Sequence, residues 1–202
     1  MNNLKLQYFF LISLAVILID QLVKFLMYQY MYMEVLPVFG NWFKLHYTTN
    51  DGMAFGIKIP GNYGKVVLSS FRLVAMFGIA YYMNVLYKQK APVGLQICVA
   101  LVFGGAIGNL VDSMFYGLFS DDLLVKFGDY NEILPPIKLF HGRVIDMFYI
   151  DIVSGYYPDW VPFLGGDYYN FWPIFNIADA AIFIAVIVIA IKQKSYFAEI
   201  KL

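Results

Sequence analysis

Four long apolar stretches constrain this chain more than any other feature of its sequence. They lie near residues 7–30, 66–87, 92–114 and 173–191. A helix needs about 20 mostly apolar residues to cross the hydrocarbon core of a bilayer, and each stretch is close to that length or longer. The pattern therefore predicts four membrane-spanning helices.

The overall composition also requires lipid as a solvent. Hydrophobic residues make up 61% of the 202 residues and charged residues 14%, whereas soluble domains are about 45–50% apolar and about 25% charged. A water-soluble fold of this length leaves roughly a third of its surface exposed and cannot hide so much apolar area. We therefore expect membrane lipid around the protein.

Charge and cysteine content narrow the possible partners and cofactors. The 14 basic and 14 acidic residues cancel, so no overall field attracts nucleic acid, and we expect no nucleic-acid partner. The single cysteine, Cys98, lies within an apolar stretch and cannot build a disulfide framework or a cysteine metal site within one chain. The sequence indicates no metal and no other cofactor.

Lysines near the predicted span ends indicate how the chain crosses the membrane. They stand at positions 5, 88, 90, 192 and 194, and basic residues beside spans favour the cytoplasmic side. We expect both termini to be cytoplasmic and the loops at about 31–65 and 115–172 to lie outside the cytoplasm. The first span lacks a small-residue cleavage site, so we interpret it as a retained helix rather than a removable signal peptide.

The first outer loop contains a strand pattern. Residues Trp42 to Thr49 alternate between aromatic or aliphatic and polar side chains, as a half-exposed strand does. Turn residues bracket this stretch at Gly40-Asn41 and Asn50-Asp51-Gly52. The expected fold class is an all-α membrane protein with four transmembrane helices and a small extracytoplasmic β-containing subdomain, forming a single membrane domain over residues 1–202.

Charged residues inside the apolar stretches are costly and need pairing or a function. Asp20 and Lys24 are four residues apart with the acid first, which is the favourable order for an ion pair within a helix. They fit a self-neutralising packing pair as well as they fit a functional site. Arg72, in the second stretch, is interpreted as a packing or interface residue.

The same polar spacing occurs at the ends of two predicted spans. Asn109 and Asp112 close the third, and Asn176 and Asp179 open the fourth with Ala178 between them. A structural hydrogen-bond network explains either pair alone. Because the pattern occurs twice, at ends predicted to share one side, it favours a site in which each helix end supplies an amide and a carboxylate.

A further acid stands just before the chain returns to the membrane. Asp146 lies among apolar residues in the segment from His141 to Phe148. An amphipathic segment at the membrane interface, with Asp146 solvated, explains this pattern about as well as a functional acid does.

In their order along the chain, these motifs resemble those of the lipoprotein signal peptidase (signal peptidase II) family. The family pattern is Asp-x-x-x-Lys, Asn-x-Gly-x-Ala-Phe, Gly-Asn-x-x-Asp, Gly-x-Val-x-Asp-Phe and Phe-Asn-x-Ala-Asp. The matching residues are Asp20 with Lys24, Asn50 to Phe55, Gly108 to Asp112, Gly142 to Phe148 and Phe175 to Asp179. The resemblance runs from about position 16 to about position 185.

The resemblance implies an intramembrane aspartic endopeptidase of the bacterial cytoplasmic (inner) membrane. Its substrate would be a lipid-modified prolipoprotein, cleaved before the diacylglyceryl-cysteine. The catalytic acids map to Asp146 and Asp179, which would share one proton and activate a water without a metal. The supporting residues map to Asp20, Lys24, Asn50, Gly108, Asn109, Asp112, Arg143, Asn176 and Ala178. Phe55 could act as an apolar lid, although the segment fits a mere turn equally well.

Three departures from the family pattern stand out. Ser113 follows the Gly-Asn-x-x-Asp acid where the family usually has arginine, and Arg143 is the candidate substitute. The segments 118–140 and 151–170 look like insertions over the site. Met147 separates Asp146 from the expected phenylalanine.

Two functions of other classes fit parts of the sequence. A transporter or channel subunit would use Asp20, Lys24, Asp112 and Asp179 as a proton or ion pathway. That function predicts acids spread through the membrane depth, whereas most of the acids lie near span ends on one predicted side. A non-enzymatic assembly factor would bind a partner through the two insertions.

Overall fold

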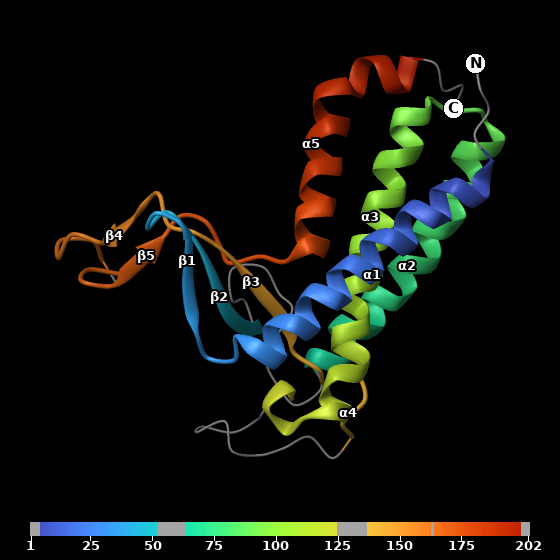
Figure 1. The fold of residues 1–202 in the computed structure, drawn as a ribbon. Coiled ribbons are helices and arrows are strands. Elements are labelled where there is room, and N and C mark those ends of the chain that lie inside the picture. Colours follow the sequence, from blue (N-terminus) through green and yellow to red (C-terminus); the bar gives the residue numbers. More distant parts are fainter. Residues whose placement is uncertain (1–4, 52–63, 125–136, 163, 199–202) are drawn as a thin grey trace.

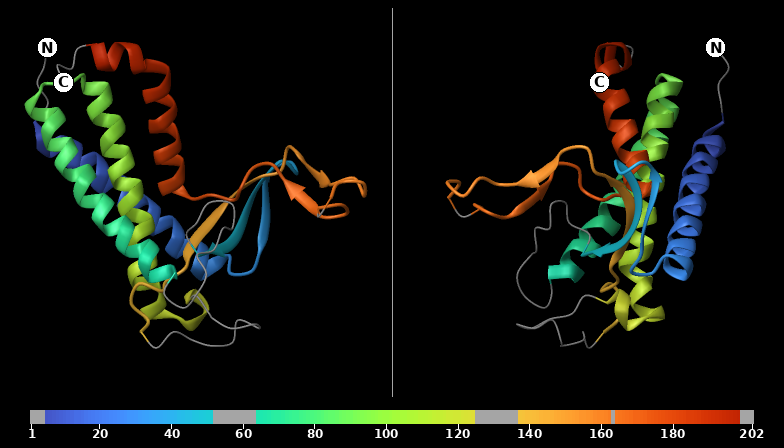
Figure 2. Two further views of the ribbon diagram at one scale, coloured as in Figure 1. Left: turned by 180° about the vertical axis from the view of Figure 1, so that it is seen from behind. Right: turned by 60° about the vertical axis from the view of Figure 1, so that its left-hand side comes forward.

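Long helices and a small sheet make up the computed structural model, which describes residues 5–51, 64–124, 137–162 and 164–198. The long helices are α1 (Leu6–Tyr30), α2 (Gly64–Lys88), α3 (Val93–Val111) and α5 (Ile177–Ala198). A π-helical turn, η2 (Asp112–Tyr116), and the short α4 (Gly117–Phe119) continue α3, and a single turn, η3 (Asp121–Leu123), follows. In Figures 1 and 2 the long helices lie side by side, and the sheet projects from one flank of this bundle.

The first three predicted spans are confirmed as apolar helices of membrane-crossing length. Within the described residues, three helical segments are long and apolar enough to cross a bilayer: Leu6–Tyr30, Gly64–Lys88 and Val93–Phe119. Their outward faces expose large apolar side chains such as Leu18, Phe71 and Val74. Because lipid rather than water suits such faces, the helices fit the predicted membrane surroundings.

The fourth predicted span, near 173–191, is not among these three segments. Helix α5 begins at Ile177 rather than near position 173, and it carries Asp179 in its first turn. Lys192 and Lys194 follow further along, so its uncharged run extends from Ala180 to Ile191.

Helix α3 lies at the centre of the bundle, and its glycines allow the neighbouring helices to approach closely. A Cβ atom at Gly104 would lie 2.8 Å from the carbonyl oxygen of Ser13 on α1. The Ser13 hydroxyl donates a 2.8 Å hydrogen bond to the Ala100 carbonyl of α3. A Cβ at Gly105 would meet Ala178 of α5. Small residues thus let both α1 and α5 pack closely against α3.

The predicted strand at 42–49 is confirmed as β2 (Phe43–Asn50). It lies between β1 (Val35–Phe39) and β3 (Val144–Ile150) in an antiparallel sheet of order β1-β2-β3. Phe43 pairs with Ile150 and Asn50 with Val144, with an irregularity between Leu45 and Thr48. The sheet is joined to the end of α1 by an apolar cluster, whose buried members are Met27, Tyr47, Leu123, Ile145 and Met147.

The two predicted insertions differ in how much of them the structure describes. Segment 151–170 contains the small hairpin β4 (Ser154–Tyr156) and β5 (Tyr168–Asn170), which lies at the far end of the sheet arm in Figure 1. Of segment 118–140, residues 125–136 fall outside the described residues, as does Phe55 of the predicted lid.

We predict that Gly104→Leu destabilises the bundle. Because the added side chain would meet the α1 backbone, overpacking should lower the free energy of unfolding by about 1–3 kcal/mol. The measurement is the thermal unfolding midpoint in detergent. Gly78→Leu on α2 is the matched control, since nothing lies within 4 Å of a Cβ there. Equal midpoints for the two variants would contradict this packing.

Candidate active site

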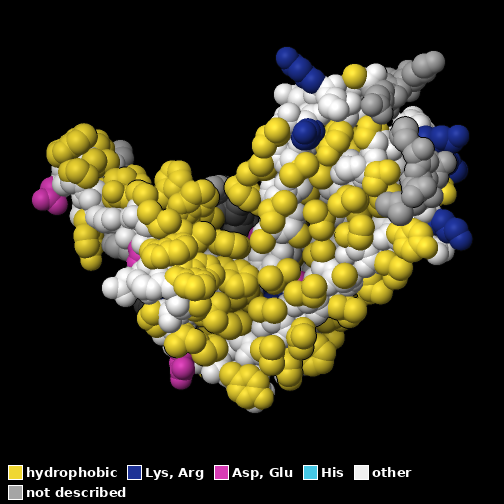
Figure 3. All heavy atoms as spheres, turned by 45° about the horizontal axis from the view of Figure 1, so that its top comes forward, with side chains coloured by type: hydrophobic (Ala, Val, Ile, Leu, Met, Phe, Trp, Pro, Cys, Tyr) yellow, Lys and Arg dark blue, Asp and Glu magenta, His cyan; other side chains and the backbone are white. Residues whose placement is uncertain are grey.

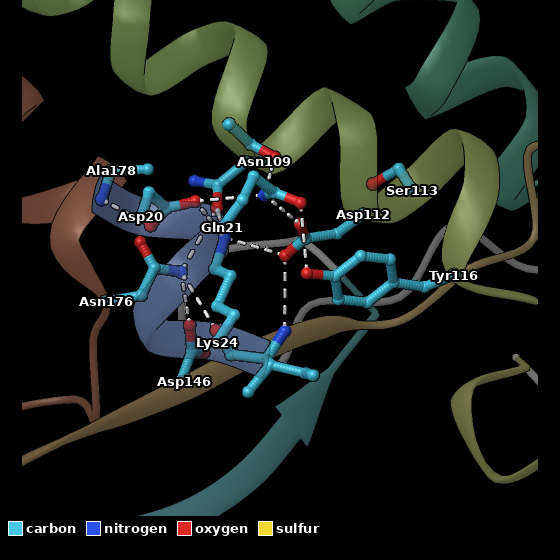
Figure 4. A network of polar contacts seen from close by, with 12 residues as sticks. Asp20, Gln21, Lys24, Asn109, Asp112, Ser113, Tyr116, Asp146, Asn176 and Ala178 are labelled. Carbon is cyan, nitrogen blue, oxygen red and sulfur yellow. Dashed lines mark hydrogen bonds and ion pairs between the residues drawn. The ribbon is translucent and has the colours of Figure 1, made fainter. Parts of the chain in front are cut away.

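Polar side chains from α1, α3, η2, β3 and the start of α5 meet at one place (Figure 4). This buried polar cluster consists of Asp20, Gln21, Lys24, Asn109, Asp112, Asp146 and Asn176. Apart from half-buried Gln21, each of its side chains is buried. Residues up to 158 positions apart in the sequence hydrogen-bond here, so the cluster joins distant segments of the chain.

The Lys24 ammonium lies between two carboxylates. Its Nζ atom is 2.7 Å from Asp20 Oδ2 and 2.7 Å from Asp112 Oδ2, and all three side chains are fully buried. It also donates a hydrogen bond to Asn109 Oδ1 at 3.1 Å. Lys24 and Asp20 therefore form an ion pair within α1. The same lysine also joins α1 to the end of α3 through Asp112.

Asp20 extends this connection to α5. Its Oδ1 atom accepts a 2.9 Å hydrogen bond from the backbone N–H of Ala178, a group in the first turn of α5 that lacks a partner within the helix. A carboxylate is also favourable beside the positive end of a helix dipole. Gly108 leaves the necessary space, because a Cβ there would lie 2.8 Å from Asp20 Oδ2 and 3.2 Å from Ala178 Cβ.

Asn176 connects the two predicted catalytic acids. Its Nδ2 atom donates to Asp146 Oδ1 at 2.6 Å and to Asn109 Oδ1 at 3.1 Å. Its Oδ1 atom accepts the backbone N–H of Asp179 at 2.9 Å, as an N-capping asparagine does at a helix start. One buried amide therefore caps α5 and holds the acid of β3.

Other amides fix the remaining carboxylate oxygens. Asp146 Oδ2 accepts a hydrogen bond from the side-chain amide of Asn50, and Asp179 Oδ1 accepts one from Asn109 Nδ2 at 2.8 Å. Burial raises the pKa of Asp146 to about 8, and repulsion from nearby Asp179 acts in the same direction. At neutral pH the arrangement thus holds a mostly protonated acid close to a second carboxyl group.

Backbone pairing brings these two acids together. The N–H groups of Met147 and Phe148 donate to the Phe175 carbonyl at 3.1 and 2.8 Å, which joins β3 to the chain just before α5. Met147 is fully buried in the apolar cluster beneath the sheet. Because side chains alternate along a strand, Asp146 then points to the opposite face. Met147 is thus an added core residue and leaves the acid in place.

The basic contact expected near Ser113 comes from α2. Lys65 Nζ and Arg72 Nη1 donate to Ser113 Oγ at 3.3 and 3.2 Å. Arg143, the residue predicted for this role, instead forms a 3.2 Å ion pair with Asp51 and donates to the Thr49 carbonyl at 3.0 Å. The sequence does not identify Lys65 as a site residue, and it indicates only a packing or interface role for Arg72.

Gln21 is a further residue that the sequence did not identify. Its Nε2 atom donates to Asp112 Oδ1 at 2.8 Å and to the Gly108 carbonyl at 3.2 Å. Its Oε1 atom accepts from the Tyr116 hydroxyl at 3.0 Å. A glutamine beside Asp20 carries no distinctive sequence signal, because its role depends on how α1 packs against α3.

The surface near this cluster is hollowed. Figure 3 shows a concave region between the sheet arm and the helices, with hydrophobic side chains along both walls and a few charged atoms near its base. Among the described residues, no three His, Cys, Asp or Glu side chains are grouped so as to hold a metal ion. The cluster can therefore offer carboxyl groups, amides and ammonium groups to a ligand that is partly apolar.

Sequence comparisons identify similar proteins along most of the chain. A family model described as signal peptidase (SPase) II matches residues 12–194. The lipoprotein signal peptidase of Amoebophilus asiaticus is 40% identical over 195 residues, which cover 95% of this chain and 79% of that protein. That of Porphyromonas gingivalis is 36% identical over 181 residues, which cover 87% of this chain and 77% of the relative.

Two solved structures share the fold. One, described as a bacterial membrane enzyme at 2.3 Å resolution, aligns with a TM-score of 0.60 and 21% identity over 94% of this chain and 88% of that one. Another, at 1.9 Å resolution, gives a TM-score of 0.59 and 23% identity over 93% and 92% of the two chains. The helices with their attached sheet are thus a known membrane-enzyme architecture.

We predict that Lys24→Met strongly destabilises the protein. Without its ammonium, Asp20 and Asp112 remain buried and uncompensated, which should cost about 3–5 kcal/mol of unfolding free energy. Thermal unfolding in detergent measures this loss.

The control makes the same substitution in an exposed pair. Lys138 and Asp121 lie 2.6 Å apart with 47% and 55% of their side chains exposed, so Lys138→Met should change stability by less than about 1 kcal/mol. Similar losses in both variants would be incompatible with a special role for the buried lysine.

Proposed function

This chain belongs to the signal peptidase II family, and on that premise we propose that it is an aspartic endopeptidase in which Asp146 and Asp179 form the catalytic dyad. Family membership makes it a membrane protease of lipoprotein processing. One observation carries the finer proposal: buried Asn176 donates to the Asp146 carboxyl group and accepts the backbone N–H of Asp179, although the two residues come from segments more than 30 residues apart.

In the proposed reaction, the two acids have different protonation states. Because the pKa of Asp146 is raised to about 8, Asp146 is the neutral acid near pH 7, and Asp179 is the base. Asp179 takes a proton from water, the resulting hydroxide attacks the scissile carbonyl carbon, and Asp146 donates its proton to the carbonyl oxygen. No covalent enzyme intermediate is needed.

The resulting tetrahedral diol then collapses to products. The C–N bond breaks as the leaving amine takes the proton held by Asp179, and a diol hydroxyl returns a proton to Asp146. Both acids end in their starting states. Asn50, Asn109 and Asn176 keep the carboxyl groups in position through these steps, since amides orient an acid without changing its charge.

The proposed substrate is a prolipoprotein whose signal peptide precedes a diacylglyceryl-cysteine. The site lies where α1 and α3 approach their ends, so the signal peptide and the acyl chains could remain in lipid while the peptide bond reaches the acids. The apolar walls of the hollow in Figure 3 suit such a substrate. Water would enter on the side of the sheet, where the backbone is not restricted to helices.

We also propose that the protein lies in the bacterial inner membrane with both termini cytoplasmic and α5 crossing the bilayer as a fourth span. Figure 1 draws the start of α1, the end of α5 and the α2–α3 link toward one end of the helices, and the sheet and α4 toward the other. Lys88 and Lys90 stand at that link. Basic residues at one end support a cytoplasmic assignment for it.

We predict that Asp146→Asn and Asp179→Asn each lower kcat by at least about 100-fold, because each removes one partner of the proton transfer. Release of the signal peptide from a lipidated prolipoprotein in detergent or lipid measures this effect. Asp151→Asn is the control, since Asp151 pairs with Lys44 beyond the end of β3, and it should stay near the wild-type rate. Full activity in either dyad variant would refute the mechanism.

The raised pKa of Asp146 also predicts a pH dependence. Asp146 must be protonated to donate to the carbonyl oxygen, and its pKa of about 8 means that the neutral form is lost as the pH rises through that value. We expect kcat to fall above pH 8. Well above this pH, kcat should decrease about tenfold for each pH unit, because the protonated fraction of Asp146 does so. A profile measured from pH 5 to 9.5 tests this, and a flat profile up to pH 9.5 would exclude Asp146 as the acid.

A further inference from the structure

Two basic side chains of α2 converge on one buried hydroxyl. Lys65 Nζ and Arg72 Nη1 lie 3.3 and 3.2 Å from Ser113 Oγ, and Ser113 is fully buried. The two residues are seven positions apart, about two helical turns, so they share one face of α2. Lys65 also donates to the Asp51 carbonyl at 2.7 Å, which directs it toward the end of β2.

The Arg72 charge acts on the proposed dyad. Its guanidinium interacts electrostatically with three carboxyl groups. The interaction with Asp179 is the strongest, followed by those with Asp112 and Asp146. Ser113 directly follows Asp112, so the hydroxyl holds the guanidinium beside the helix end that carries Asn109. Since Asn109 in turn donates to Asp179, the cation and the proposed base are attached to the same end of α3.

Two other cations near the site face carboxylates, and a third, Lys65, donates to the Ser113 hydroxyl and the Asp51 carbonyl. Lys24 lies between Asp20 and Asp112, and Arg143 pairs with Asp51. The titratable and charged groups around the dyad are Asp20 and Lys24 of α1, Asp51 directly after β2, Lys65 and Arg72 of α2, Asp112 of η2, and Arg143 directly before β3.

An ionised dyad needs a nearby positive charge. In a site of low dielectric constant, ionising a carboxyl group without a counter-charge is costly. Asp146 is buried and Asp179 is half-buried beside it. Lys24 acts on Asp146 as well, but it is shared between Asp20 and Asp112. The Arg72 guanidinium keeps its charge throughout the working pH range.

We propose that Arg72 is a positioning residue that keeps one acid of the dyad ionised, and that the Ser113 hydroxyl holds its guanidinium in place. This inference rests on the proposed aspartic mechanism. It gives α2 a direct part in the chemistry, and it explains why serine serves at the position after Asp112: the positive charge comes from the neighbouring helix.

The test is the pH profile of kcat for substitutions that separate charge from hydrogen bonding. Arg72→Gln keeps a donor for Ser113 and removes the charge, so the dyad should hold both protons to higher pH. We expect its acidic limb to move up by about one pH unit, with about a tenfold loss at the acidic end and a smaller loss near pH 8. Arg72→Lys keeps the charge and should hold the limb near its wild-type position.

A relocation of the charge completes the experiment. Arg72→Gln combined with Ser113→Arg returns a cation to the same end of α3 and should restore the acidic limb. Lys88→Met, in the last turn of α2, is the control for loss of a positive charge on this helix and should leave the profile unchanged. Thermal unfolding midpoints identify any variant that folds poorly. If Arg72→Gln folds poorly, the acidic limbs of Arg72→Lys and of the double variant test the proposal.

The outcomes distinguish the two proposals. A uniform loss in Arg72→Gln at every pH, with the limb unmoved, would overturn the inference and leave Arg72 a structural residue. If Asp179→Asn cleaves at the wild-type rate, the aspartic mechanism itself fails. If both dyad variants are inactive while Arg72→Gln keeps the wild-type profile, the role of Arg72 alone is wrong.

Discussion

The ion cluster of Lys24 with Asp20 and Asp112 is the interaction on which the rest of the structure depends. Burying a charge without partners costs several kcal/mol, so the lysine and its two acids must stay together once α1 and α3 pack. The second oxygen of Asp20 binds the N–H of Ala178, which fixes the start of α5 to the same cluster. Asp179 is the next residue along the chain, so the position of the proposed base follows from an ion pair that takes no part in the chemistry.

The immediate partners of the two proposed catalytic acids are mainly neutral amides. Asn50 and Asn176 donate to Asp146, and Asn109 donates to Asp179. An amide fixes the orientation of a carboxyl group and favours neither protonation state as strongly as a contacting cation would. The pair can therefore exchange a proton during the reaction while staying in place. The charges of Arg72 and Lys24 act on the two acids as well and adjust the balance between their protonation states.

Local patterns predicted much of the fold, and long-range packing decided the rest. Apolar length predicted the spans, and alternation predicted β2, because both signals depend on neighbouring residues. The repeated Asn-x-x-Asp spacing predicted that two helix ends meet, and Asn109 and Asn176 are indeed hydrogen-bonded. The contact of Arg72 with Ser113 joins residues 41 positions apart, and no local pattern in either segment predicts it.

The start of α5 was misplaced because Pro173 to Asn176 is apolar enough to resemble a span while its backbone is extended or irregular.

The π-helical turn at the end of α3 explains how the sheet is attached to the helices. Such turns widen a helix locally and often occur at functional sites. Here the carbonyl of Ser113 accepts the N–H of Gly142 at 3.0 Å, and the carbonyl of Met114 accepts that of Phe140 at 3.1 Å. Gly142 permits this approach because any Cβ atom there would collide with the Asp112 carbonyl. The chain entering β3 is thus hydrogen-bonded to the helix end that carries Asp112, and Asp146 follows only four residues later. The glycine of the Gly-x-Val-x-Asp pattern therefore positions the acid: it lets β3 start close enough to α3 for Asp146 to hydrogen-bond to Asn176.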